Sequence, residues 1–187
     1  MLTLKNEHGS ASWRPLPGGA WLFCGKSFAD QRGTSHEAVD LSNSPFRSPF
    51  TAVQENLVKT TFRGVARGLH YQVGPSAQAK LVSVVNGRAQ FFWLPVQDIN
   101  KHPTVRSIVL EAGATSLYTE PGCAHGFLAL EAGTVFLLRM SRPVSLADRG
   151  EINLLAPDIS IRFAVPLRED LLSKRDREAP SWSARRR

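Results

Sequence analysis

Short apolar runs, separated by turn residues, occupy the middle of the chain. Residues 80–96 hold two such runs on either side of Asn86-Gly87, a pair that tolerates positive φ and is typical of a two-residue β-hairpin. Further short strands are predicted at 106–110, 116–119, 127–130 and 134–140. The last two flank Glu131-Ala132-Gly133, where we expect a second hairpin. Many short strands with Gly, Pro and Asn between them predict an all-β fold, either a β-sandwich or a jelly roll.

Helical patterning is scarce before the C-terminal part of the chain. Residues 167–179 predict short helical turns, with Ser173 as a cap. We therefore expect a single domain over residues 21–180. The segment 1–20 and the tail 181–187, which ends in three arginines, are expected to be the least ordered parts.

The composition is that of an ordinary globular protein. With 187 residues, of which 42% are hydrophobic, the chain is long enough for one domain with a substantial core. No apolar run approaches the roughly 18 residues of a membrane span, and the first residues show no apolar stretch typical of a secretory signal. Cys24 and Cys123 lack the spacing of metal ligands, which favours a reducing compartment. We therefore expect a cytoplasmic protein without a membrane partner.

The formal net charge is +7, and the three C-terminal arginines supply three of these charges. The remaining excess suits a small phosphate-bearing ligand, and it equally suits a solvated basic surface. The sequence shows no cluster of basic residues with exposed aromatic ones along one face, so nucleic acid is not an expected partner.

The stretch from Arg67 to Lys80 carries the most informative candidate residues. His70 titrates near neutrality and is a candidate general base, and Gly68 leaves room for a ligand near the backbone. Lys80 is a candidate for stabilising an enolate oxygen, and Arg67 for binding phosphate through its guanidinium group. The alternatives are a strand histidine satisfied by a neighbour and two surface cations at strand ends.

A second histidine, His125, follows the Pro121-Gly122 turn. A metal site would need a His-x-His pair with a carboxylate further on, and neither histidine has another histidine two positions away. We therefore predict no bound metal. Cys123, two positions before His125, is interpreted as a small buried side chain.

Asp176, near the end of the chain, has two interpretations. An aspartate that bonds to a histidine orients the ring and raises its basicity. The spacing between Ser173 and Asp176 also matches a capping box, so support for a helix start is the alternative role.

Six segments in this order resemble the dTDP-4-dehydrorhamnose 3,5-epimerase family over residues 30–180. They are Asp30-Gln31-Arg32-Gly33 with Glu37, Gln54-Glu55-Asn56, Arg67-Gly68-Leu69-His70-Tyr71-Gln72, Gln78-Ala79-Lys80-Leu81-Val82, Pro121-Gly122-Cys123-Ala124-His125-Gly126-Phe127, and Leu172-Ser173-Lys174-Arg175-Asp176-Arg177. Each segment alone is weak, whereas six in register are specific. The resemblance implies a cupin-like jelly roll that works as a homodimer on a nucleoside-diphosphate sugar, without a metal or another cofactor.

The resemblance also implies roles for individual residues. His70, paired with Asp176, would remove the proton beside the C4 ketone of a 4-keto-6-deoxyhexose, and Lys80 would stabilise the enolate. The implied ligand contacts are His125 in the sugar pocket, Arg67 at the pyrophosphate, Gln54 and Asn56 at the nucleotide, and Arg32 and Glu37 reaching over from the partner subunit.

Two positions depart from the family pattern. The family's proton-donor tyrosine, 13 residues after the second histidine, is Leu138 here, and its aspartate, 11 residues after the lysine, is Phe91. Tyr71, Tyr118 or a water molecule are the alternative donors. We predict a nucleotide-sugar epimerase-like enzyme. A single-carbon epimerase, a keto-sugar isomerase and a non-catalytic sugar-nucleotide-binding protein remain the alternatives.

Overall fold

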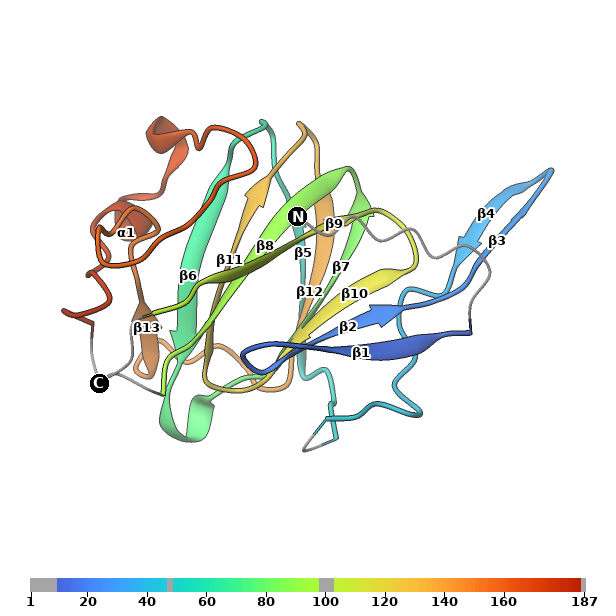
Figure 1. The fold of residues 1–187 in the computed structure, drawn as a ribbon, viewed down its shortest axis with the longest axis horizontal. Helices are drawn as coiled ribbons and strands as arrows, with labels where there is room; N and C mark the ends of the chain where they lie inside the picture. Colours follow the sequence, from blue (N-terminus) through green and yellow to red (C-terminus); the bar gives the residue numbers. More distant parts are fainter. Residues whose placement is uncertain (1–9, 47–48, 98–102, 186–187) are drawn as a thin grey trace.

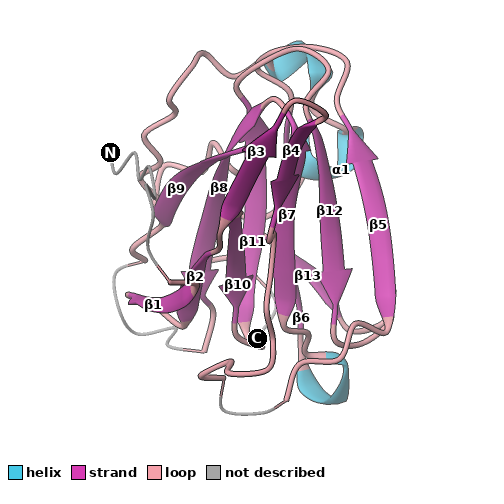
Figure 2. Ribbon diagram, turned by 90° about the vertical axis from the view of Figure 1, so that its right-hand side faces the viewer, coloured by secondary structure: helices cyan, strands magenta, loops and turns pink. Residues whose placement is uncertain are grey.

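The computed structural model describes residues 10–46, 49–97 and 103–185, and within these ranges the chain is built mainly from two antiparallel sheets (Figures 1 and 2). The six-stranded sheet has the order β1 (Ser12–Leu16), β2 (Ala20–Cys24), β10 (Thr115–Thr119), β7 (Lys80–Asn86), β12 (Val135–Met140) and β5 (Gln54–Lys59). The five-stranded sheet has the order β13 (Arg149–Glu151), β6 (Ala66–Gln72), β11 (Cys123–Ala129), β8 (Arg88–Pro95) and β9 (Arg106–Glu111). The all-β, jelly-roll prediction is confirmed.

Smaller elements complete the fold. The strands β3 (Ser27–Asp30) and β4 (Gly33–His36) form a hairpin that projects from the body, at the right of Figure 1. Three short helices are described: η1 (Gly74–Ser76), η2 (Glu169–Leu171) and α1 (Lys174–Arg177). The last two confirm the predicted C-terminal helical turns, and Ser173 caps α1 as expected, because its Oγ accepts from the Asp176 amide at 3.1 Å.

Two predicted hairpins are wrong in their pairing. The chain does reverse at Gly87, which has a φ of 75°, but β7 lies in the six-stranded sheet and β8 in the five-stranded one. Likewise β11 and β12, on either side of 131–133, lie in different sheets. Turn residues specify where a chain reverses. The pairing partner depends on which face each strand buries. Nearly all residues of β8 and β11 are buried, so apolar and polar residues do not alternate along them and the sequence does not show which face turns toward which sheet.

Two apolar layers hold the sheets in place. The layer between the sheets contains Leu22, Val82, Phe91, Trp93, Leu117, Phe127 and Phe136. A second layer lies on the other face of the five-stranded sheet, where Leu69, Tyr71 and Phe92 contact a cluster with Ile152, Leu172 and Trp182 from the C-terminal segment. The C-terminal segment is therefore packed against the strand that carries His70.

The described residues near the two ends of the chain pack against the rest of the domain. β1 pairs with β2 from Ser12 onward. Near the other end, Trp182 and Arg185 are 5% and 7% exposed, and the Arg185 guanidinium lies over the Trp182 ring. Residues 1–9 and 186–187 lie outside the described ranges. No helix within these ranges is long and apolar enough to cross a membrane.

Candidate active site

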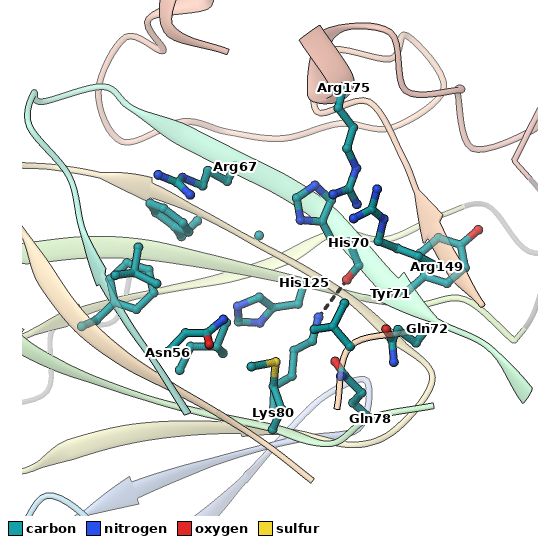
Figure 3. A pocket seen from close by; sticks show the side chains of 17 residues that line it. Asn56, Arg67, His70, Tyr71, Gln72, Gln78, Lys80, His125, Arg149 and Arg175 are labelled. Carbon is teal, nitrogen blue, oxygen red and sulfur yellow. Dashed lines mark hydrogen bonds between the residues drawn. The ribbon is translucent and has the colours of Figure 1, made fainter. Parts of the chain in front are cut away.

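A cavity of about 280 Å³ opens between the two sheets (Figure 3). The five-stranded sheet contributes Arg67, His70, Gln72, His125, Phe127 and Arg149, and the six-stranded sheet contributes Asn56, Val58, Lys80, Phe136, Leu138 and Met140. Tyr71, Gly126, Gln78, Val144 and Arg175 complete its lining. The site therefore depends on the packing of two sheets whose strands are distant in sequence.

His70 and Asp176 meet although 106 positions separate them. His70 Nε2 lies 2.5 Å from Asp176 Oδ1, with the carboxylate side chain 5% exposed. The Ser173 hydroxyl donates to Asp176 Oδ2 at 2.8 Å. Burial alone would raise the pKa of the Asp176 carboxyl, but bonds from His70, Ser173 and the Gly68 amide lower it below the usual value. Asp176 thus supports the helix start and orients His70 at the same time.

Gly68 has a different role from the one expected. Its φ is 115°, and a Cβ at this position would lie 2.7 Å from the Gly126 Cα and 2.8 Å from the His125 carbonyl oxygen. The neighbouring strand β11, not a ligand, occupies the space that the missing side chain leaves. The glycine therefore lets the two histidine-bearing strands approach each other.

Lys80 reaches across the cavity floor toward the base. Its Nζ donates to the backbone carbonyl oxygen of His70 at 3.0 Å, the dashed line in Figure 3. The side chain is buried, and this desolvation lowers the pKa of the ammonium group to about 8. Lys80 therefore exchanges protons near neutral pH while staying next to His70.

His125 stands beside His70 in the adjacent strand, in direct register. The residue is 6% exposed, and neither ring nitrogen has a hydrogen-bond partner among the described residues. Burial, followed by the charges of Lys80 and His70, lowers the pKa of His125 well below its usual value. A neutral imidazole, with one donor and one acceptor, therefore faces the cavity.

Three arginines surround the cavity mouth. Arg67 was expected there, whereas Arg149 and Arg175 were not singled out from the sequence. Glu151 binds both of the latter, with Arg149 Nε at 3.1 Å and a close contact to Arg175 Nε. Three guanidinium groups and one carboxylate leave this rim positive, which suits a phosphate-bearing ligand. The position of Arg175 beside Asp176 was the available signal, since α1 brings both residues to β6.

Asn56 lines the cavity, as expected, and Gln54 lies next to it. Gln54 Nε2 donates to Asn56 Oδ1 at 3.2 Å, and Gln54 Oε1 accepts from the Val144 amide at 3.1 Å. Arg32 and Glu37 are not brought to the cavity within this chain. Arg32 bonds to Asp30 on the β3–β4 hairpin, and Glu37 accepts from the Lys26 amide.

Leu138 and Phe91, the two positions expected from the sequence to depart from the family pattern, lie in opposite sheets and are linked through Phe136. Leu138 lines the cavity and lies opposite Asn56 in the β12–β5 register. Phe136, on the same strand, contacts the buried ring of Phe91 edge-on at 5.2 Å. Phe91 also lies 6.2 Å from the His125 ring, centre to centre. The side of the cavity that faces His70 is therefore mostly hydrocarbon.

Neither tyrosine of the chain presents its hydroxyl to this side of the cavity. Tyr71 follows His70 in β6, so its ring lies on the opposite face of the sheet, where it packs over Gly150. Tyr118 stacks on Phe46 with ring centres 3.6 Å apart, and its hydroxyl donates to Glu120 at 3.3 Å. The two substitute donors considered from the sequence are therefore directed elsewhere.

Comparisons with known proteins match most of the chain to one family and to solved structures with the same fold. The sequence profile of one family, described as dTDP-4-dehydrorhamnose 3,5-epimerase, matches residues 16–184. A relative of that name from Streptomyces griseus is 32% identical over 174 residues, 89% of this chain and 84% of the relative. The crystal structure of dTDP-4-dehydrorhamnose 3,5-epimerase from Elizabethkingia anophelis has a TM-score of 0.80 at 28% identity, covering 91% of this chain and 96% of that one. A 3'-monoepimerase from Streptomyces bikiniensis, in complex with dTDP-quinovose, has a TM-score of 0.81 at 28% identity, with 90% and 87% covered.

Proposed function

Because this chain belongs to the dTDP-4-dehydrorhamnose 3,5-epimerase family, we propose that it is a nucleotide-sugar epimerase-like enzyme. It binds a 4-keto-6-deoxyhexose linked to a nucleoside diphosphate and removes a proton from a carbon beside the C4 ketone. That proton is acidic because the charge left on carbon spreads onto the ketone oxygen.

The contact between His70 and Asp176 carries this proposal. A carboxylate at 2.5 Å from Nε2 fixes the ring and leaves Nδ1 as the nitrogen that takes the proton. Lys80, bonded to the His70 carbonyl, lies where a cation stabilises the developing enolate oxygen. Preorganised charge in a water-poor site favours the enolate over the ketone.

The charges and amides around the base fit the rest of the ligand. Arg67, Arg149 and Arg175 supply guanidinium groups for the diphosphate. Asn56, with Gln54 beside it, supplies amide groups for the nucleotide, and the neutral His125 imidazole bonds to a sugar oxygen. These assignments are proposals, and each predicts weaker binding when the side chain is truncated.

A more limited reaction is the second candidate, and Leu138 favours it. Inversion at a carbon needs removal of the proton on one face and its return on the other. Leu138, which we take to stand at the position of the family's donor, lines the cavity and has no proton to donate. This second candidate includes three possibilities: epimerisation at one carbon, a keto-sugar isomerisation, and binding without turnover.

We further propose a cytoplasmic homodimer in which each β3–β4 hairpin brings Arg32 and Glu37 to the partner's cavity. The hairpin is exposed over its whole length, and Phe28 on it is 62% exposed. Co-expression of an Arg32→Ala chain with a His70→Asn chain tests this, because mixed dimers would regain one site with both residues intact. No regain of activity in dimers isolated by two affinity tags would count against the shared site.

The function is tested with dTDP-4-keto-6-deoxyglucose in deuterated water, with hydrogen exchange at each sugar carbon followed by NMR. The expected result is exchange beside the ketone, and none with dTDP-6-deoxyglucose, which has no ketone to acidify its neighbours. Tight binding of the keto sugar without exchange would instead identify a binding protein. Absence of both would refute the proposal.

A further inference from the structure

The proton-carrying side chains of the cavity gather on one side of it. His70 and His125 project from adjacent strands of the five-stranded sheet, in register with each other. Lys80 begins on the opposite sheet, but its Nζ is held 3.0 Å from the carbonyl oxygen of His70 itself. Figure 3 shows the His70 and His125 rings and the Lys80 side chain around the same part of the cavity. We therefore expect all three nitrogen groups to approach a ligand from the side of the base.

The side that faces the base offers no comparable group. Val58, Phe136, Leu138 and Met140 line it with hydrocarbon, and Asn56 adds an amide, which does not act as an acid near neutral pH. Phe91, from β8 of the five-stranded sheet, contacts the Phe136 ring edge-on across the layer between the sheets. Among the described residues that line the cavity there is no Ser, Thr, Asp or Glu. Tyr71 is part of the lining, but its ring packs on the other face of β6, against Gly150 and the cluster that holds Ile152 and Leu172.

We propose that this site moves protons along one face of the sugar, and so shifts the ketone from C4 to the neighbouring C3 instead of inverting a carbon. This inference rests on the proposed function, namely that a nucleotide-linked 4-keto sugar binds with its ketone near Lys80 and its C3–H bond near His70.

The step balances with the groups present. His70 takes the proton from C3, the C3–H electron pair forms a C3=C4 double bond, and O4 takes a proton from the Lys80 ammonium. The resulting enediol then loses the proton of its C3 hydroxyl to the Lys80 amine, and the C3=O bond forms. His70 returns its proton to C4 on the same face. No oxidant or reductant is needed, because C4 gains the hydrogen that C3 loses.

Two properties of Lys80 fit the oxygen transfers. Burial lowers the pKa of its ammonium group to about 8, so both the charged and the neutral form are accessible near neutral pH. Its bond to the His70 backbone carbonyl also holds the amine beside the residue that carries the base.

The experiment follows dTDP-4-keto-6-deoxyglucose labelled with ¹³C at C4, in deuterated water, by NMR with the wild-type protein. The expected result is loss of the C4 ketone signal and a new ketone at C3. The configuration of the other sugar carbons should be unchanged. An epimer inverted at C3 or C5 would overturn the inference and leave the proposed function standing. No exchange at any carbon would overturn both.

Leu138→Tyr provides the complementary test, because it places a hydroxyl on the hydrocarbon side of the cavity. We expect this variant to form an epimer inverted at C3 or C5, which the wild type does not form. The amount of this epimer should exceed the NMR detection limit by tenfold or more. Leu138→Phe is the matched control, since it has the same ring without the hydroxyl, and no inversion is expected from it. Inversion by both variants, or by neither, would contradict the idea that a missing donor sets the outcome.

Discussion

Asp176→Asn is the change that isolates the pairing of the carboxylate with His70. The amide has nearly the same size as the carboxylate and still bonds to the Ser173 hydroxyl, so α1 keeps its cap. What the variant loses is the negative charge that lies 2.5 Å from His70 Nε2. The imidazolium that forms when His70 takes a proton then has no counter-charge.

The expected size of the effect follows from that single contact. Hydrogen bonds to a charged group contribute about 1.5–3 kcal/mol, and 1.4 kcal/mol corresponds to a tenfold change in rate. The rate of hydrogen exchange beside the ketone should therefore fall about 10- to 150-fold. Binding of the nucleotide part should change little, because the Asp176 carboxylate contacts His70, Ser173 and the Gly68 amide.

The assay is the initial rate of deuterium uptake into dTDP-4-keto-6-deoxyglucose, measured beside the dissociation constant for dTDP. Asp170→Asn is the matched control, since this exposed aspartate in η2 bonds to Arg168 at 2.6 Å and lies away from the cavity. An exchange rate within threefold of the wild type in Asp176→Asn would refute the orienting role. A fall of equal size in the control would point to a general disturbance of the C-terminal segment.

Three further predictions concern the stability of the fold and the buried side chains of Lys80, Asp176 and His125. As the pH rises from about 8 to about 10.5, the free energy of unfolding of the wild type should increase by about 3 kcal/mol relative to that of Lys80→Met. The reason is that Lys80 loses its proton in the folded state over this range and keeps it in the unfolded state. Urea titrations at several pH values measure the difference. Below about pH 3.8, wild type should lose stability relative to Asp176→Asn, since the unfolded carboxyl takes up a proton before the folded one; acid titration by circular dichroism measures it. His125→Phe should raise the thermal midpoint by removing two unbonded buried nitrogens, yet weaken keto-sugar binding measured by calorimetry; a lower midpoint would contradict the unbonded state.

The sequence predicted the class of fold and the turn at Gly87 well, since turn chemistry is local. It did not predict that β7 and β8 separate into different sheets, because both apolar runs suit either sheet. Pairing across 74 positions, as between Thr60 and Thr134, is decided by packing of the whole domain. For a similar reason the sequence did not indicate that Trp182 joins a buried cluster with Leu69 and Phe92, which lie far from it in the chain.

The candidate site was predicted in part. His70, Lys80, His125, Arg67 and Asn56 all line the cavity. Arg149 and Arg175 were missed, because an arginine at an edge strand or in a short helix looks like a solvated cation until the cavity is formed. Sequence also left the directions of Tyr71 and Tyr118 open. Strand register settled them, since a shift of one residue moves a side chain to the other face.

The central claim is that His70 takes the proton beside the ketone, and His70→Asn tests it most directly. The measurement is deuterium uptake into dTDP-4-keto-6-deoxyglucose by this variant and by wild type, at saturating sugar and equal protein concentration. We expect exchange beside the ketone in the wild type and a fall of about 1,000-fold or more in the variant, with dTDP still bound. Exchange that persists in His70→Asn at a rate near that of the wild type would contradict it.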